Sequence, residues 1–124
     1  MENVRTYTAG LLNAPRSFTV RGTQVVLDSD LAALYGVPTK RLNEQVRRSP
    51  ERFPQDFVFL LTAEEWESVR LQIAASKDRR GSRRKHLPYA FTEAGVLMAA
   101  GVLTSRRAAE VSIHTIRALF AMQR

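Results

Sequence analysis

The 124-residue chain contains no cysteine, and this absence excludes a disulfide framework, thiol chemistry and cysteine-ligated zinc. It has only two histidines, His86 in a basic stretch and His114 on a polar helix face, and these are too few for the ligand set of a metal site. We therefore expect no metal and no cofactor. The longest apolar run, residues 94–103, is about 10 residues, whereas a membrane-spanning helix needs about 20. No signal peptide is evident, so we expect a cytoplasmic protein.

Acidic residues are also in the minority. Lys and Arg number 19 against 12 Asp and Glu, which gives a net charge of +7. Residues 77–86, which we call the basic segment, hold six of the Lys and Arg residues against one Asp. This concentration predicts a polyanionic partner, with nucleic acid first and an anionic membrane surface or an acidic protein as alternatives. With 44% hydrophobic and 25% charged residues, the chain has the composition of one globular domain.

What the sequence does contain, in residues 28–53, is the pattern of a helix-turn-helix. The first helix is expected to be capped by Asp28 or Ser29 and to end at Gly36, because glycine adopts the positive φ that ends helices. Pro38 disfavours helix just before it, and Thr39 can cap a second helix at about residues 40–48.

The second helix has one apolar face, with Leu42 and Val46 expected to point inward. Apart from Glu44, its other residues are basic or carry amides, which are the groups that contact phosphates and base edges in the major groove. The alternative is a solvated face on which Glu44 pairs with Lys40 or Arg48. The predicted DNA-contacting residues of this helix are Lys40, Arg41, Asn43, Gln45, Arg47 and Arg48.

The basic segment is predicted to be a loop or wing that lies along phosphates. Residues 28–56 carry five acidic and five basic residues, so most of the affinity is expected to come from the basic segment. The alternative is a solvated, protease-sensitive loop. The predicted phosphate-contacting residues are Arg79, Arg80, Arg83, Arg84 and Lys85.

The remaining elements follow from local patterns. We expect a β-hairpin at about residues 17–27, a buried strand at 57–61 and an extended stretch at 87–91 that pairs with it. Thr62 and Glu65 form a capping box for a helix to about Ala75, and Thr92 caps a buried helix over residues 93–103.

A last helix is expected to run to about Met122, and it carries two apolar stripes. The second stripe predicts a homodimer contact or docking against another protein, through Val111, Ala118 and Met122. The chain is thus predicted to be α+β, with a helix-turn-helix core, about five helices and a small antiparallel sheet. Residues 1–16 are expected to form a flexible arm or strand, and residues 17–124 a single DNA-binding domain excised from a longer protein.

Two motifs carry a family resemblance: RFPQDF at residues 52–57 and LPYAFTEAG at residues 87–95. Together with RGTQVVLDSDLAALYGV at residues 21–37, they resemble the phage and bacterial domain family named "Open Reading Frame Six, N-terminal", a relative of the KilA-N and Bro-N domains. The resemblance implies a DNA-binding domain of a phage or prophage transcriptional regulator. It implies no enzymatic activity.

We therefore expect sequence-specific binding to double-stranded DNA, in the cytoplasm of a bacterial host and at its nucleoid. The alternative is an antirepressor-like module that binds a repressor or another protein through the last helix. A nuclease or other enzyme would need a carboxylate or histidine cluster that the order of residues does not indicate.

Overall fold

The computed structural model describes residues 15–103. In chain order this part contains β1 (Phe18–Val20), β2 (Thr23–Leu27), α2 (Asp28–Tyr35), α3 (Thr39–Arg48), β3 (Val58–Leu60), α4 (Ala63–Ala75), β4 (Tyr89–Phe91) and α5 (Glu93–Val102). The α+β class is confirmed, with four helices and a four-stranded antiparallel sheet among the described residues. The predicted last helix, with Val111, Ala118 and Met122, lies outside these residues.

The four strands lie in the order β1-β2-β4-β3, and each pair of neighbours is antiparallel. Arg21 and Gly22 join β1 to β2, and both have positive φ, at 55° and 71°, as a two-residue type I′ hairpin turn requires. β4 lies between β2 and β3, so Phe91 has Val26 as its partner on one side and Val58 on the other. The predicted pairing of residues 87–91 with residues 57–61 is confirmed.

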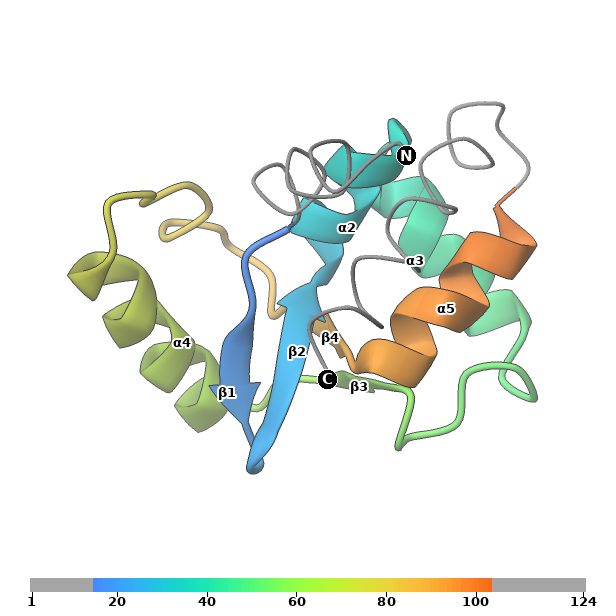
Figure 1. Ribbon diagram of the computed structural model, residues 1–124, viewed down its shortest axis with the longest axis horizontal. Helices are drawn as coiled ribbons and strands as arrows, with labels where there is room; N and C mark the ends of the chain where they lie inside the picture. The colour runs from blue at the N-terminus through green and yellow to red at the C-terminus, as the bar shows by residue number, and fades with distance from the viewer. Residues whose placement is uncertain (1–14, 104–124) are drawn as a thin grey trace, which may run out of the picture.

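Helices cover both faces of the sheet (Figure 1). Neighbouring residues of a strand point to opposite faces, and β4 shows this directly. Ala90 packs with the side of the sheet covered by α4, where Trp66, Val69 and Ile73 are buried. Phe91 packs on the other side with residues of α2, α3 and α5. The pair α2 and α3 is therefore attached to the sheet face opposite α4.

Two of the predicted helix caps are wrong. Asp28 and Thr39 are each the first residue of their helix, and the residues that precede them, Leu27 and Pro38, provide no side-chain cap. Asp28 is instead buried and its carboxylate serves other donors. The predicted end at Gly36 is confirmed, because Gly36 adopts the left-handed conformation with φ 69°.

The caps of the two later helices are confirmed. Thr62 accepts a hydrogen bond from the Glu65 N–H and the Glu65 side chain accepts from the Thr62 N–H, so the capping box of α4 is complete. The Thr92 side chain accepts from the N–H of Gly95 in α5.

Two expectations of burial were too strong. Only Val58 is buried within β3, and Leu60 is 49% exposed, because β3 lies at the edge of the sheet. The nearly all-apolar α5 is buried on one side, through Gly95, Val96 and Ala99, while Gly101 is exposed.

Candidate nucleic-acid interface

α3 is attached to the domain by one face. Leu42 is fully buried and Val46 is 8% exposed, both in the core that α3 shares with α2 and α5. No acidic residue lies in the first turn of α3, and no ion pair joins Glu44 to Lys40 or Arg48. Four of its predicted contact residues are exposed and Gln45 is half-buried; the exposed ones are Lys40, Arg41, Arg47 and Arg48.

The basic segment contains both paired and unpaired cations. Arg80 pairs with Asp78 at 2.7 Å within the segment, and this hydrogen-bonded pair lowers the pKa of Asp78 to about 2. Arg84 pairs with Asp28, outside the segment. The cations that form no ion pair with another described residue are Lys77, Arg79, Arg83 and Lys85, all of them exposed.

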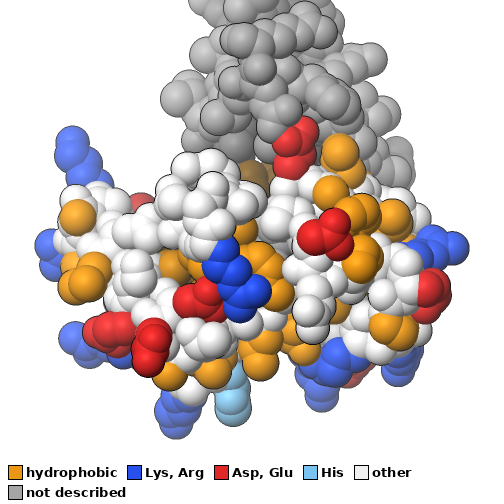
Figure 2. Space-filling model, turned by 90° about the horizontal axis from the view of Figure 1, so that it is seen from below, with side chains coloured by type: hydrophobic (Ala, Val, Ile, Leu, Met, Phe, Trp, Pro, Cys, Tyr) orange, Lys and Arg blue, Asp and Glu red, His pale blue; other side chains and the backbone are white. Residues whose placement is uncertain are grey.

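The start of α3 and the end of the basic segment line one open hollow of about 270 Å³. Thr39 is on the α3 side, and Lys85 and His86 are on the other; Ser29, Gly81 and Arg84 complete the lining. In Figure 2, Lys and Arg side chains project along the lower rim of the molecule, on both sides of the histidine side chain. The first residue of α3 and the end of the basic segment, which are far apart in sequence, thus lie at one hollow.

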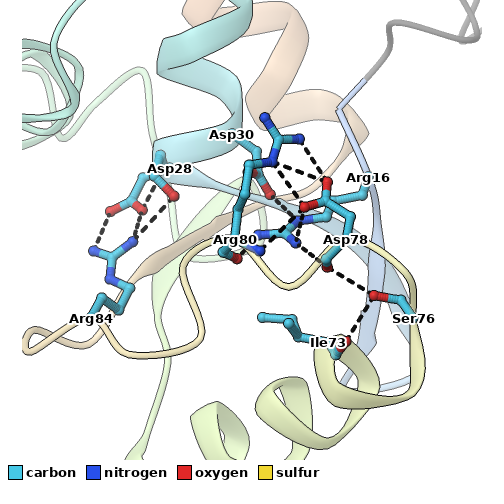
Figure 3. Close-up of polar contacts among 9 residues, drawn as sticks. Arg16, Asp28, Asp30, Ile73, Ser76, Asp78, Arg80 and Arg84 are labelled. Carbon is cyan, nitrogen blue, oxygen red and sulfur yellow. Dashed lines mark hydrogen bonds and ion pairs between the residues drawn. The ribbon is translucent and has the colours of Figure 1, made fainter.

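A fully buried carboxylate lies beneath this surface (Figure 3). Asp28 Oδ1 accepts from Arg84 Nη1 at 2.7 Å, and Oδ2 accepts from Asn43 Nδ2 at 2.9 Å. The N–H groups of Ser29 and Tyr89 donate to the same carboxylate, at 2.7 Å and 3.1 Å. Arg84 and Asn43, both expected to contact DNA, therefore meet at one buried charge that joins the basic segment to α2 and α3.

Arg16 makes a second connection between α2 and the basic segment, which the sequence analysis did not predict. Its Nε donates to Asp30 Oδ2 at 2.9 Å, and its other nitrogens donate to the carbonyl oxygens of Asp78 and Arg80. The basic segment is therefore tied to the first turn of α2 near both of its ends, by Arg16 and by Arg84. A lone arginine before a strand gives no local signal for such a role, because its partners lie up to 64 residues away.

Residues 15–103 hold no group of three or more His, Cys, Asp or Glu side chains that could bind a metal ion. None of the helices over these residues is long and apolar enough to cross a membrane.

Comparison with protein-family models gave a match. The family model described as "ORF6N domain" matches residues 16–102, which is most of the chain and includes β1 through α5. Neither the curated proteins nor the solved structures gave a match. The matched region contains both the exposed face of α3 and the basic segment. The chain belongs to the ORF6N domain family.

Proposed function

We propose that this chain is a double-stranded DNA-binding domain in which α2 and α3 act as a helix-turn-helix. The observation that carries the proposal is the hollow that Thr39 of α3 shares with Lys85 and His86 of the basic segment. It places the first residue of α3, which Lys40 follows in the chain, beside the exposed Lys85 of the segment. A duplex that receives α3 in its major groove presents its phosphates to the neighbouring segment.

The charges on this surface support the proposal. Lys40, Arg47 and Arg48 are exposed and form no ion pair with another described residue. Unpaired cations close together repel one another, and phosphates neutralise them with release of the counterions condensed on DNA. We propose that the segment contributes Arg79, Arg83 and Lys85 to phosphate contacts.

We assign contacts with base edges to fewer residues of α3 than the sequence analysis predicted. Gln45 is half-buried on the flank of α3, and the arginines beside it are exposed. Their amide and guanidinium groups suit adenine and guanine edges. Asn43 donates its amide to Asp28, and so we propose a structural role for it. The proposal includes no catalytic activity.

The test is selection of bound duplexes from a random library, performed at two salt concentrations. We expect an enriched sequence motif, and a fall of affinity with salt that reports several neutralised phosphates. Weak binding with steep salt dependence and no enriched motif would instead favour the antirepressor-like hypothesis, in which the partner is a protein.

A double substitution assigns the contacts to α3. Arg41→Ala with Arg47→Ala is expected to weaken binding to the selected duplex by at least about 30-fold, because each of the two lost contacts is worth about 1–3 kcal/mol. The control is Arg21→Ala with Arg70→Ala, which removes the same charge from the hairpin turn and α4. Unchanged affinity in the α3 variant would refute the assignment of α3 as recognition helix.

A further inference from the structure

The first turn of α2 contains two acidic residues, and both are used as attachment points for arginines from elsewhere. Asp28 is fully buried and binds Arg84 at the end of the basic segment. Asp30 binds Arg16, whose side chain also donates to the carbonyl oxygens of Asp78 and Arg80 near the start of the segment. Both ends of the basic segment are therefore held by one helical turn.

The Asp28 cluster is specific in its geometry. A buried carboxylate is stable only when donors compensate for the lost water. Here the donors come from the basic segment, from Asn43 on α3 and from the Tyr89 N–H of β4. Displacement of any one of these elements would leave the charge undercompensated. The cluster therefore fixes the basic segment relative to α3 and the sheet.

The same geometry occupies Arg84. Its Nη1 donates to Asp28 and its Nε donates to the carbonyl oxygen of His86, and its side chain is only 20% exposed. Neighbouring Arg83 and Lys85 are exposed. Arg84 thus turns inward between two residues that face solvent.

We propose that Asp28 and Arg84 are positioning residues for DNA binding, which hold the cations of the basic segment at a fixed distance from the α3 face. This rests on the proposed function above. Arg84 contributes through the alignment of Arg83 and Lys85 and makes no phosphate contact of its own. Asp30 and Arg16 hold the other end of the segment in the same way.

The Asp28→Asn variant tests the proposal, because a role of charge alone and a positioning role predict opposite changes in DNA affinity. If only charge mattered, removal of a negative charge and release of Arg84 would strengthen DNA binding. Under the proposal, binding to the selected duplex weakens by about tenfold, because the freed side chains must be ordered again on binding. The affinity ratio between selected and random duplexes also falls.

The matched control is Glu44→Gln, which removes one negative charge from α3 without loss of any observed ion pair. It is expected to bind random duplex as tightly as the wild type or more tightly. Amide hydrogen exchange gives the structural readout: in Asp28→Asn, exchange accelerates over residues 78–86 while α4 stays protected.

The proposal would be overturned if the Asp28→Asn variant folds, binds DNA as tightly as the wild type and keeps the sequence preference of the wild type. If this variant does not fold, Asp30→Asn and Arg84→Lys are measured in the same way, and unchanged affinity and preference in both have the same consequence. Failure of the wild type to bind any duplex would refute the proposed function instead, and hydrogen exchange over residues 78–86 would still show whether Asp28 holds the segment.

Discussion

At Gly95 the backbone of α5 passes directly against the loop that precedes β3. A Cβ atom at this position would lie 2.2 Å from the carbonyl oxygen of Phe57, a distance that carbon and oxygen atoms cannot share. The adjacent Thr92 donates its hydroxyl to that same oxygen at 3.1 Å, and its N–H donates to it at 2.9 Å. The glycine of the LPYAFTEAG motif thus allows the RFPQDF motif to dock on α5.

Gly95→Ala is therefore expected to lower the free energy of unfolding by about 1–3 kcal/mol, as overpacking in a rigid environment does. The steric penalty outweighs the gain of up to about 1 kcal/mol that alanine normally gives over glycine in a helix. Gly101→Ala is the control, because a Cβ there meets nothing within 4 Å, and it should be neutral or stabilising. Urea unfolding of both variants checks this, and equal effects of the two would contradict the close approach at Gly95.

At the scale of elements, α3 has two separable faces. Leu42 is fully buried in the core with α2 and α5. Leu42→Ala should lower the free energy of unfolding by about 2–5 kcal/mol through the lost contacts and the cavity left behind. Lys40→Ala should change it by less than about 0.5 kcal/mol, because its side chain is exposed.

The matched apolar control for Leu42→Ala is Leu71→Ala on α4, where the leucine is 67% exposed. Chemical denaturation monitored by circular dichroism distinguishes the three variants. A cost at Leu71 similar to that at Leu42 would mean that α3 is not held by its Leu42 face.

The elements that could be predicted from the sequence are those whose signals are local. The hairpin, the end of α2 at Gly36 and the Thr62–Glu65 capping box each depend on residues a few positions apart. Asp28 was misassigned for the same reason, because an acid before an apolar helix usually caps it. Its actual partner, Arg84, lies 56 residues further along the chain, and no pattern within one element indicates such a pairing.

At the scale of the whole molecule, two carboxylates should contribute to the loss of stability in acid. Hydrogen bonds from Arg21 lower the pKa of Glu65 from 4.5 to about 2, and Arg80 lowers the pKa of Asp78 from 3.8 to about 2. Because these pKa values are lower in the folded state, their stabilising contribution is complete above pH 4.5 and is lost as the pH falls toward 2.

The melting temperature should therefore fall as the pH is lowered through this range. Arg21→Gln, which removes the tie between the hairpin turn and α4, should be less stable than the wild type at pH 7, and the difference should shrink toward pH 2. The arginines of the two pairs, Arg21 and Arg80, are 48% and 78% exposed, so solvent screens both pairs and the effect is modest. Thermal unfolding at stepped pH measures it, and a difference independent of pH would show that the ion pair does not contribute.

The sequence predicted the two parts of the candidate interface, α3 and the basic segment, but not how they are joined. The exposed cations of α3 and of the basic segment follow from composition and helical periodicity. That the start of α3 and the end of the basic segment line one hollow depends on strand order and on the buried charge of Asp28, and both are properties of the folded chain.

The central position of β4 in the sheet affects the order in which the fold forms during synthesis. The chain is synthesised from its N-terminus, so β1, β2, α2, α3 and β3 all leave the ribosome before β4, which must then insert between β2 and β3. Until it does, Tyr89 cannot donate to Asp28, and Arg84 has no formed cluster to join. A nascent chain therefore completes the Asp28 cluster, and with it the attachment of Arg84, only after residue 91 has emerged.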